Sequence, residues 1–472
     1  MAATPDASAT GITTLAADGP RATVLQQLRE KFVSMMQHLH LTSQGAHLAV
    51  SFLEEPATQD FISTHASILD SSFAKTAMTD IMRQQLQQSD YIFSGIKTFH
   101  ELNEAFPSLI DENGNRKPFE QFLNDVRKID EKYNSAYLKA EYNFCQQSAN
   151  MAAKWEQYQK DGDRYNLQYR TAGDDHVRPA HAALDRITLP PSHPFWQQYF
   201  PPNGWNCRCT VVQVRKSKYP VTPDSEVQHL IEQYTSDGSS ARKEDMFRFN
   251  PGMQKKTVPD YNAYTIRRCQ DCDIAKAATP NASATGITLA AFVPENELCQ
   301  ACQLIRVCQQ KQQKEAAEDL ARLAFEAYSS EKWKHSFFSK KGFGFVVTER
   351  QRLLEATASP NEIDKFRKEY RMCRVAADNG YEVQFLRGNG RKAGQTYDIL
   401  LDSTPTDLKS TGSMGNLVKH IKKAYKKQGA KAVLLELESH DPLLYDKLNE
   451  AKRKYNVSIY FYFKDDKRIR KM

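Results

Sequence analysis

The stretch that decides the fold of the central part of the chain is Pro201-Pro-Asn-Gly-Trp-Asn-Cys-Arg-Cys-Thr210, which leads directly into Val211-Val-Gln-Val214. It ends a proline-rich segment that begins at Leu189. Upstream of that segment lies Leu167-Gln-Tyr-Arg-Thr-Ala-Gly-Asp-Asp-His-Val-Arg-Pro-Ala-His181. Valine and threonine after a cluster of turn residues are typical of a strand entered through a loop. We therefore expect a strand over Cys209 to Val214.

The side chains in this region allow two interpretations. His181, Cys207 and Cys209 are metal-ligand types, and His193 is a possible fourth ligand. The alternative is a packed, hydrogen-bonded motif in which Arg170 pairs with an acidic neighbour and the cysteines are buried as small apolar residues. The sequence leaves both interpretations open.

The same residues resemble the Mu F-like minor head protein family of tailed phages and prophages. The resemblance covers roughly Phe93 to Val214, and its matching pieces are Arg170-Thr171, Asp174-Asp175, His181, Pro201 to Trp205 and Asn206-Cys-Arg-Cys-Thr210. It implies an α+β head domain that acts in head morphogenesis, with portal and capsid proteins as partners. It also implies a location in the virion, and it implies no catalytic activity for this region.

The composition of the chain excludes several classes of protein. The 472 residues are 40% hydrophobic and 26% charged, with a mean hydropathy of −0.64. This is a core-forming composition, not that of a collagen or a globally disordered chain. No run approaches the roughly 20 apolar residues that a spanning helix needs. The first 20 residues also have neither the basic nor the apolar region of a secretory signal. We expect no membrane partner, and a location in the virion or the host cytoplasm.

The predicted architecture is multidomain α+β. We divide the chain into a flexible segment (1–25), a helical region with the head domain (26–216), a linker with a cysteine module (217–310), a helical connector (311–360) and a compact α/β domain (361–472). Apolar periodicity predicts helices over Gln26 to Leu41 and Lys117 to Asp161. A small-residue segment, Ala2 to Thr13, recurs as Ala277 to Thr288; it is either a linker or insertion, or a recognition or processing tag.

Two C-x2-C pairs predict a structural zinc site. Cys269 and Cys272 form the first pair, and Cys299 and Cys302 form the second. Each pair can present two thiolates from one tight turn, and two such turns can enclose Zn2+ in a tetrahedral cage closed to water. The alternatives are reduced cysteines without a metal, or a redox or disulfide role.

The C-terminal 112 residues form a basic module. They contain 24 Lys and Arg residues against 15 Asp and Glu residues, a net charge of +9, whereas the rest of the chain has a net charge of −2. Predicted elements alternate: helix 361–379, strands 381–386, 397–401 and 406–410, helix 416–428, strand 432–437, helix 442–455 and strand 458–463. This pattern predicts a compact α/β domain, and its charge favours a nucleic-acid partner.

Asp398, Asp407 and Lys409 are candidate catalytic residues in this module. A hairpin between their strands would bring the two carboxylates to one end, and Lys409 would share a face with Asp407. Such a set can hold a divalent cation such as Mg2+ and stabilise a pentavalent phosphate. The alternative is an exposed hairpin with a salt bridge.

The following helix carries a candidate nucleic-acid-binding surface. Its lysines at i, i+3, i+4 and i+7 form one stripe, while three apolar residues face the other way. The lysines are Lys419, Lys422, Lys423 and Lys426, and the apolar residues are Leu417, Ile421 and Ala424. A solvated surface without a ligand is the alternative interpretation.

The stretch from about Phe366 to Phe463 is similar to the nuclease toxin domains at the C-terminus of contact-dependent inhibition proteins. Those domains carry an Asp, then Glu-x-Lys or Asp-x-Lys, then a lysine-rich helix and a Gln, which here would be Gln428. The resemblance implies an RNase toxin that often acts on tRNA and has a cognate immunity protein. By this match the catalytic residues are Asp398, Asp407 and Lys409, with Thr411 and Gln428 as weaker candidates. Asp407 replaces the Glu of many relatives.

We therefore expect a phage or prophage minor head protein that carries a C-terminal nuclease, with RNA favoured over DNA as its substrate. Two alternatives remain. The C-terminal domain of a purely structural virion protein could bind packaged DNA, or the domain could be a metal-dependent DNA nuclease.

Overall fold

The computed structural model describes residues 22–43, 46–235, 245–265, 269, 293–388, 395–412, 414–438 and 443–472. The chain forms two compact units, Met1–Gln310 and Lys311–Met472. Among the described helices, none combines the length and apolar character that crossing a bilayer requires.

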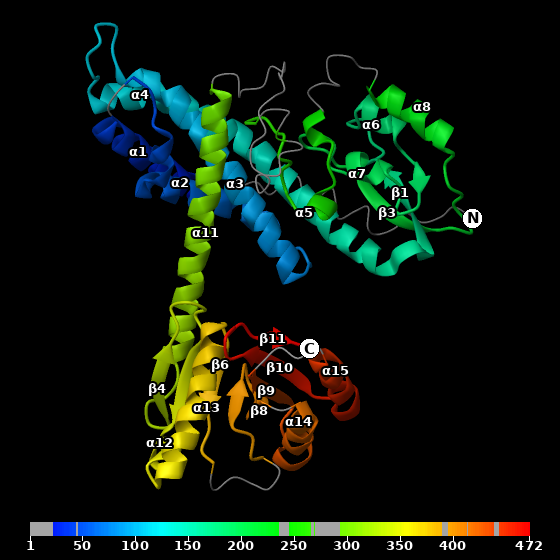
Figure 1. Cartoon of the computed structure of the whole chain (residues 1–472). Coiled ribbons are helices and arrows are strands. Elements are labelled where there is room, and N and C mark those ends of the chain that lie inside the picture. Colours follow the sequence, from blue (N-terminus) through cyan, green and yellow to red (C-terminus); the bar gives the residue numbers. More distant parts are fainter. Residues whose placement is uncertain are drawn as a thin grey trace. The chain divides into compact units, whose positions relative to one another are not determined.

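The first unit is built mainly on a group of packed helices (Figure 1). Its helices are α1 (Ala22–Thr42), α2 (Pro56–Ser71), α3 (Asp80–Ala105), α4 (Phe119–Glu131) and α5 (Leu138–Asp161). The two predicted helical regions are confirmed, although a π-helical segment, Lys132–Tyr137, separates α4 from α5. The apolar faces of these helices form one core that includes Leu28, Phe61 and Phe122.

A small sheet and short helices complete the head region of this unit. The antiparallel sheet has the order β2-β1-β3, with β1 at Tyr165–Arg170, β2 at Thr188–Leu189 and β3 at Thr210–Arg215. The predicted strand after Cys209 is confirmed as β3. Helices α6 (Pro179–Ala183), α7 (Phe195–Tyr199) and α8 (Asp224–Thr235) pack around the sheet. The presence of α8 differs from the loop that we expected after residue 216.

The segment 217–310 contributes to the core of the first unit. It contains α8, α10 (Pro251–Gln254) and the start of α11 (Glu295–Glu326), a helix that extends past residue 310. Its buried residues Phe249, Tyr264 and Leu298 belong to the same core as α1 to α5. Instead of a free linker, the described part of this segment therefore packs against the helices.

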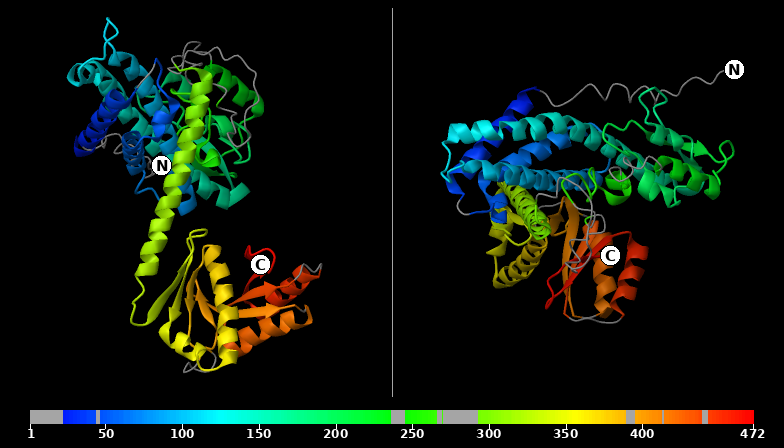
Figure 2. Two further views of the ribbon diagram at one scale, coloured as in Figure 1. Left: turned by 60° about the vertical axis from the view of Figure 1, so that its left-hand side comes forward. Right: turned by 90° about the horizontal axis from the view of Figure 1, so that it is seen from above.

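The second unit is built on an eight-stranded sheet with the order β11-β10-β9-β8-β7-β6-β5-β4 (Figure 2). Its strands are β4 (Trp333–Phe338), β5 (Phe345–Glu349), β6 (Glu382–Phe385), β7 (Ile399–Leu401), β8 (Thr404–Thr411), β9 (Ala432–Leu437), β10 (Ser458–Phe463) and β11 (Arg470–Lys471). Each of the five strands that we predicted in this module is present.

The segment 311–360 corrects the expectation of a helical connector. It begins with the end of α11 but then contributes β4 and β5, with β5 pairing in parallel with β6. The physical reason is the run Phe345-Val-Val347, whose β-branched residues are buried within the sheet. The α/β domain therefore extends N-terminal to residue 361.

Helices cover both faces of this sheet. Helix α13 (Pro360–Asp378) shares a core with Leu434 of β9, whereas α14 (Met414–Gln428) and α15 (Leu444–Tyr455) share a core with Val433 and Leu435. Successive residues of a strand point to opposite faces, so α13 lies on one side and α14 with α15 on the other. A short helix, α12 (Arg350–Ala356), joins β5 to α13. The result is a three-layer domain with a sheet that is buried on both faces.

Candidate functional sites

The predicted hairpin in the second unit is confirmed, and it brings the candidate residues together. Strands β7 and β8 pair antiparallel, with Ile399 opposite Thr406, and their turn contains Asp402 and Ser403 at positive φ. Asp398 directly precedes β7, so it lies beside Asp407 of β8. Asp407 and Lys409 are two residues apart on one strand and point to the same face.

Asp398, Asp407, Lys409 and Gln428 form one connected cluster. The Lys409 ammonium contacts Asp407 Oδ2 and lies 4.0 Å from Asp398 Oδ2. Asp398 Oδ2 accepts a hydrogen bond of 2.9 Å from the Leu408 backbone N–H, and Gln428 Nε2 donates a bond of 2.7 Å to Asp407 Oδ1. Gln428 ends α14, so this helix helps to position Asp407.

The cluster is partly open to solvent. The side chains of Lys409 and Asp398 are 16% and 17% exposed, whereas that of Asp407 is fully buried. Burial, together with the nearby Asp398 charge, raises the pKa of Asp407 to about 8 against the opposing effect of Lys409. A carboxyl group whose pKa lies near neutrality can gain or lose a proton during a reaction.

Sequence reasoning did not identify Glu369 and His420 as neighbours of this cluster. Burial raises the pKa of Glu369 on α13, and the Asp398 charge raises it further. The guanidinium of the buried Arg352 donates a hydrogen bond of 2.9 Å to Glu369. Burial lowers the pKa of His420 on α14, and the Lys409 charge adds to this effect. No spacing along the chain connects these residues with the Asp-x-Lys pair.

The lysine stripe lies where the periodicity predicts it. Lys419, Lys422, Lys423 and Lys426 are exposed, whereas Leu417, Ile421 and Ala424 of the same helix are buried. The weaker candidate Thr411 lies on β8 two residues beyond Lys409 and pairs with Leu437 in the sheet register. The stripe and the cluster both involve α14.

The two cysteine pairs of the predicted zinc module are described only in part. Cys299 and Cys302 lie one turn apart on α11, so this pair is helical, where we expected a tight turn. Cys269 is partly exposed, and Cys272 lies outside the described residues. The tetracysteine zinc site stays a prediction.

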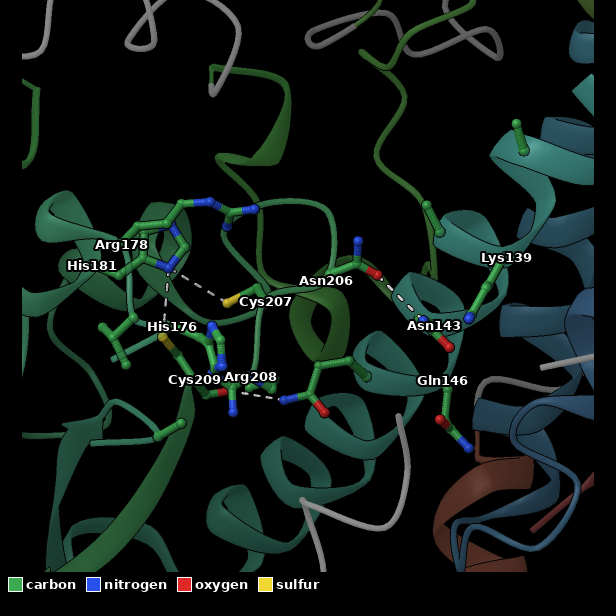
Figure 3. Close-up of a pocket in the computed structure, with 15 residues that line it drawn as sticks. Lys139, Asn143, Gln146, His176, Arg178, His181, Asn206, Cys207, Arg208 and Cys209 are labelled. Carbon is green, nitrogen blue, oxygen red and sulfur yellow. Dashed lines mark hydrogen bonds between the residues drawn. The ribbon is translucent and has the colours of Figure 1, made fainter. Parts of the chain in front are cut away.

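A second cluster lies in the first unit, where His181 of α6 meets the loop that leads into β3 (Figure 3). His181 Nδ1 lies 3.7 Å from Cys207 Sγ and 3.5 Å from Cys209 Sγ. All three side chains are buried, and the three ligand atoms lie within 4.8 Å of one another. His193 is not part of this cluster, because its ring accepts a bond from the Phe195 N–H and lies 3.5 Å from Asp224.

This cluster borders a pocket of about 610 Å³. Part of its wall comes from α5, through Lys139, Asn143 and Gln146, and part from the loops around α6 and β3 (Figure 3). The loops contribute three further basic side chains: His176, Arg178 and Arg208. The pocket is therefore lined by cations and amides, with sulfur and imidazole on one side.

Interactions within the cluster shift the pKa values of its two cysteines in opposite directions. A hydrogen bond with Cys209 lowers the pKa of Cys207, and the same bond raises the pKa of Cys209. Asp174 pairs with Arg208, whereas we expected Arg170 to pair with an acidic neighbour. The packed-motif interpretation is thus correct about an Arg–Asp pair and about burial of the cysteines, but with a different arginine.

The comparisons with known proteins match the region that contains this pocket. Residues 112–212 match the family described as phage Mu protein F like protein. A stretch of 104 residues is 35% identical to a protein of Escherichia phage Mu that is provisionally named capsid assembly protein F, and the match covers 22% of this chain and 21% of that protein. No solved structure matches the chain. One region of the chain is thus similar to this family, and the match spans about a fifth of the length of the curated relative.

Proposed function

We propose that the first unit acts in assembly of a phage head, where it contacts capsid or portal proteins in the virion. The observation that carries this proposal is the Mu F-like match over residues 112–212, which includes the pocket wall on α5 and the loop that leads into β3. The named phage Mu relative supports the same process.

The test is the composition of particles produced by the phage or prophage that encodes the chain. Purified particles should contain the protein, and deletion of residues 112–212 should reduce the yield of DNA-filled heads. Particles that lack the protein, together with an unchanged yield after the deletion, would contradict this function.

We propose a second function for the second unit: cleavage of phosphodiester bonds, with RNA, and tRNA in particular, as the favoured substrate. It is supported by the meeting of Asp398, Asp407 and Lys409 beside a helix that exposes four lysines. The lysines would bind the phosphate backbone, and the partly exposed cluster would act on one phosphate. A nuclease of this kind would require an immunity protein in the cell that produces it.

Two mechanisms fit the cluster. In the first, the carboxylates of Asp398 and Asp407 would hold Mg2+, which supplies Lewis acid chemistry when bound. Both residues supply the oxygen ligands that Mg2+ prefers. Asp398 is held next to Asp407, because its Oδ2 accepts a hydrogen bond from the backbone N–H of the following residue, Leu408. Lys409 would then neutralise charge on the phosphate, and Gln428 would keep Asp407 in place.

In the second mechanism, the RNA 2′-hydroxyl attacks the adjacent phosphorus. A carboxylate takes the proton from this hydroxyl, and Asp398 suits this role because its side chain is partly exposed, whereas that of Asp407 is fully buried. Lys409 stabilises the charge that develops on the phosphorane oxygens. The bond between phosphorus and the 5′-oxygen then breaks, and this oxygen takes a proton from water. The products would be a 2′,3′-cyclic phosphate and a 5′-hydroxyl.

Cleavage by the purified chain in the presence and absence of EDTA separates the two mechanisms. Loss of cleavage with EDTA, restored by Mg2+, supports the first, and EDTA-resistant RNA cleavage with cyclic phosphate ends supports the second. The matched control for variants of Lys409 is Lys467→Ala. Asp465 and Lys467 have the same Asp-x-Lys spacing as Asp407 and Lys409, and they are exposed in the same unit. The nuclease function fails if neither RNA nor DNA is cleaved under either condition.

A further inference from the structure

The cluster of His181, Cys207 and Cys209 has the geometry of a metal site. In tetrahedral zinc coordination, bonds of about 2.0–2.1 Å to nitrogen and about 2.3 Å to sulfur place the nitrogen and sulfur atoms about 3.6 Å apart. The two nitrogen–sulfur distances here are 3.7 and 3.5 Å. Both nitrogen–sulfur distances therefore match those of a zinc tetrahedron, and the two sulfur atoms lie within 4.8 Å of each other.

The charges of the three groups also favour a divalent cation. Two thiolates and one neutral imidazole together carry two negative charges, which Zn2+ balances. A neutral complex can be buried at much lower cost than two thiolates without a cation. Sulfur and imidazole nitrogen are the ligands that zinc prefers, and they disfavour Mg2+ and Ca2+.

The residues around the cluster supply hydrogen bonds to the ligands. Asn203 Nδ2 donates a bond of 3.0 Å to the Tyr169 hydroxyl oxygen, and this hydroxyl in turn interacts with Cys209. Because its oxygen accepts from Asn203, the hydroxyl proton is left to bond the Cys209 sulfur. Donors of this type fix the orientation of metal-bound thiolates. The Tyr169 and Asn203 side chains are both buried, so this support is built into the core.

We propose that His181, Cys207 and Cys209 bind one Zn2+ ion through three protein ligands, with the fourth coordination position directed to the pocket and filled by water. The observation that favours an open position is the pocket of about 610 Å³, which the same three side chains line. This ion would connect α6 to the loop that enters β3. The site is distinct from the predicted tetracysteine site, because none of its ligands belongs to that set.

The test is the zinc content of the purified full chain and of single variants. Cys207→Ser, Cys209→Ser and His181→Asn should each lose about one equivalent of zinc per chain relative to the unmodified protein. Cys373→Ser is the matched control, since this buried cysteine belongs to the second unit and is not one of the cluster residues, and this variant should keep its zinc. Unchanged zinc content in all three site variants would overturn the proposal.

A second measurement keeps the proposal testable if the site variants fail to fold. Zinc X-ray absorption of the Cys269→Ser/Cys299→Ser chain reports on the cluster alone, because the tetracysteine cage cannot be completed in this variant. We expect one zinc with two sulfur neighbours at about 2.3 Å and two nitrogen or oxygen neighbours at about 2.0 Å. A folded variant that contains no zinc, or zinc without sulfur neighbours, would show that the cluster is a hydrogen-bonded thiol–imidazole group instead.

Discussion

Each unit contains a lysine beside carboxylates, and the two settings differ in exposure. In the first unit, Lys97 Nζ lies 2.6 Å from Glu141, and the two side chains are only 1% and 3% exposed. In the second unit, Lys409 contacts the buried Asp407, but the side chain of Lys409 is 16% exposed. The same residue types thus make a sealed ion pair in one unit and an accessible cluster in the other.

The sealed pair belongs to a network without access for a ligand. Lys97 also donates to the Tyr133 carbonyl and lies 2.9 Å from His65 Nε2, while the Tyr264 hydroxyl donates to Glu141. Lys97 lowers the pKa of Glu141 to about 2 despite its burial. Each partner is satisfied inside the helical core, which indicates a structural role. In contrast, the cluster in the second unit leaves an amine and a carboxylate within reach of solvent.

The largest effect that this comparison predicts is on stability of the first unit. Lys97→Met removes the cation and leaves Glu141 buried without its partner, so we expect the free energy of unfolding to fall by about 3–5 kcal/mol. Denaturant unfolding of the full chain measures this change. Cleavage by the second unit should be unaffected below the transition. A change under 1 kcal/mol would mean that the pair is not a structural element.

Lys409→Ala should have the opposite effects: a large loss of cleavage and little loss of stability. In the proposed nuclease mechanism it removes the group that would face the developing phosphate charge, so we expect the cleavage rate to fall about 100- to 1,000-fold. The melting temperature should change little, because Lys409 is partly exposed. Rates measured on the same RNA with Lys467→Ala provide the control, which should match the unmodified chain. Equal rates for Lys409→Ala and the control would remove Lys409 from the active site.

The lysine stripe should affect binding more than chemistry. Replacing Lys419, Lys422, Lys423 and Lys426 with Gln removes up to four phosphate contacts. We expect the slope of log K against log salt concentration to decrease in magnitude by about 3, while the cleavage rate at saturating RNA is largely kept. Binding titrations at several salt concentrations measure the slope. An unchanged slope would identify the stripe as a solvated surface without a ligand.

The last prediction concerns the dependence of stability on pH. The folded pKa of Asp407 is raised to about 8 from the ordinary value of 3.8, so the folded state holds a proton that the unfolded state releases above pH 4. This contribution to stability is fully present below about pH 4 and is lost as the pH rises through 8. Relative to Asp407→Asn, the unmodified second unit should therefore be less stable at pH 8 than at pH 5. Thermal unfolding at both pH values tests this, and a constant difference would contradict the raised pKa.

The sequence predicted the strands and the hairpin whose residues form a local pattern. The buried strands β9 and β10 have the predicted bounds, because each is a mainly apolar run that is followed by a charged residue. The hairpin that pairs Asp398 with Asp407 follows from two short apolar strands and the turn between them. The strand after Cys209 is likewise a local signal.

The parts that the sequence did not predict depend on packing between distant segments. Strands β4 and β5 were missed because they follow a long helix. They enter the sheet through the pairing of β5 with β6, and β4 pairs with β5 at the edge. Glu369 of α13 lies near Asp398 of the cluster, and no sequence spacing predicts this proximity. The basic residues Lys139, Arg178 and Arg208, which line the pocket in the first unit, also converge only in three dimensions.

The most direct test of the central claim is expression of residues 311–472 in bacteria, since these residues form one compact unit with their own core, whereas a fragment that begins at residue 361 lacks β4 and β5. The account predicts that the unmodified fragment arrests growth and degrades tRNA, and that the same fragment with Lys409→Ala is tolerated at equal expression. Growth with intact tRNA and DNA at high levels of the folded, unmodified fragment would contradict it.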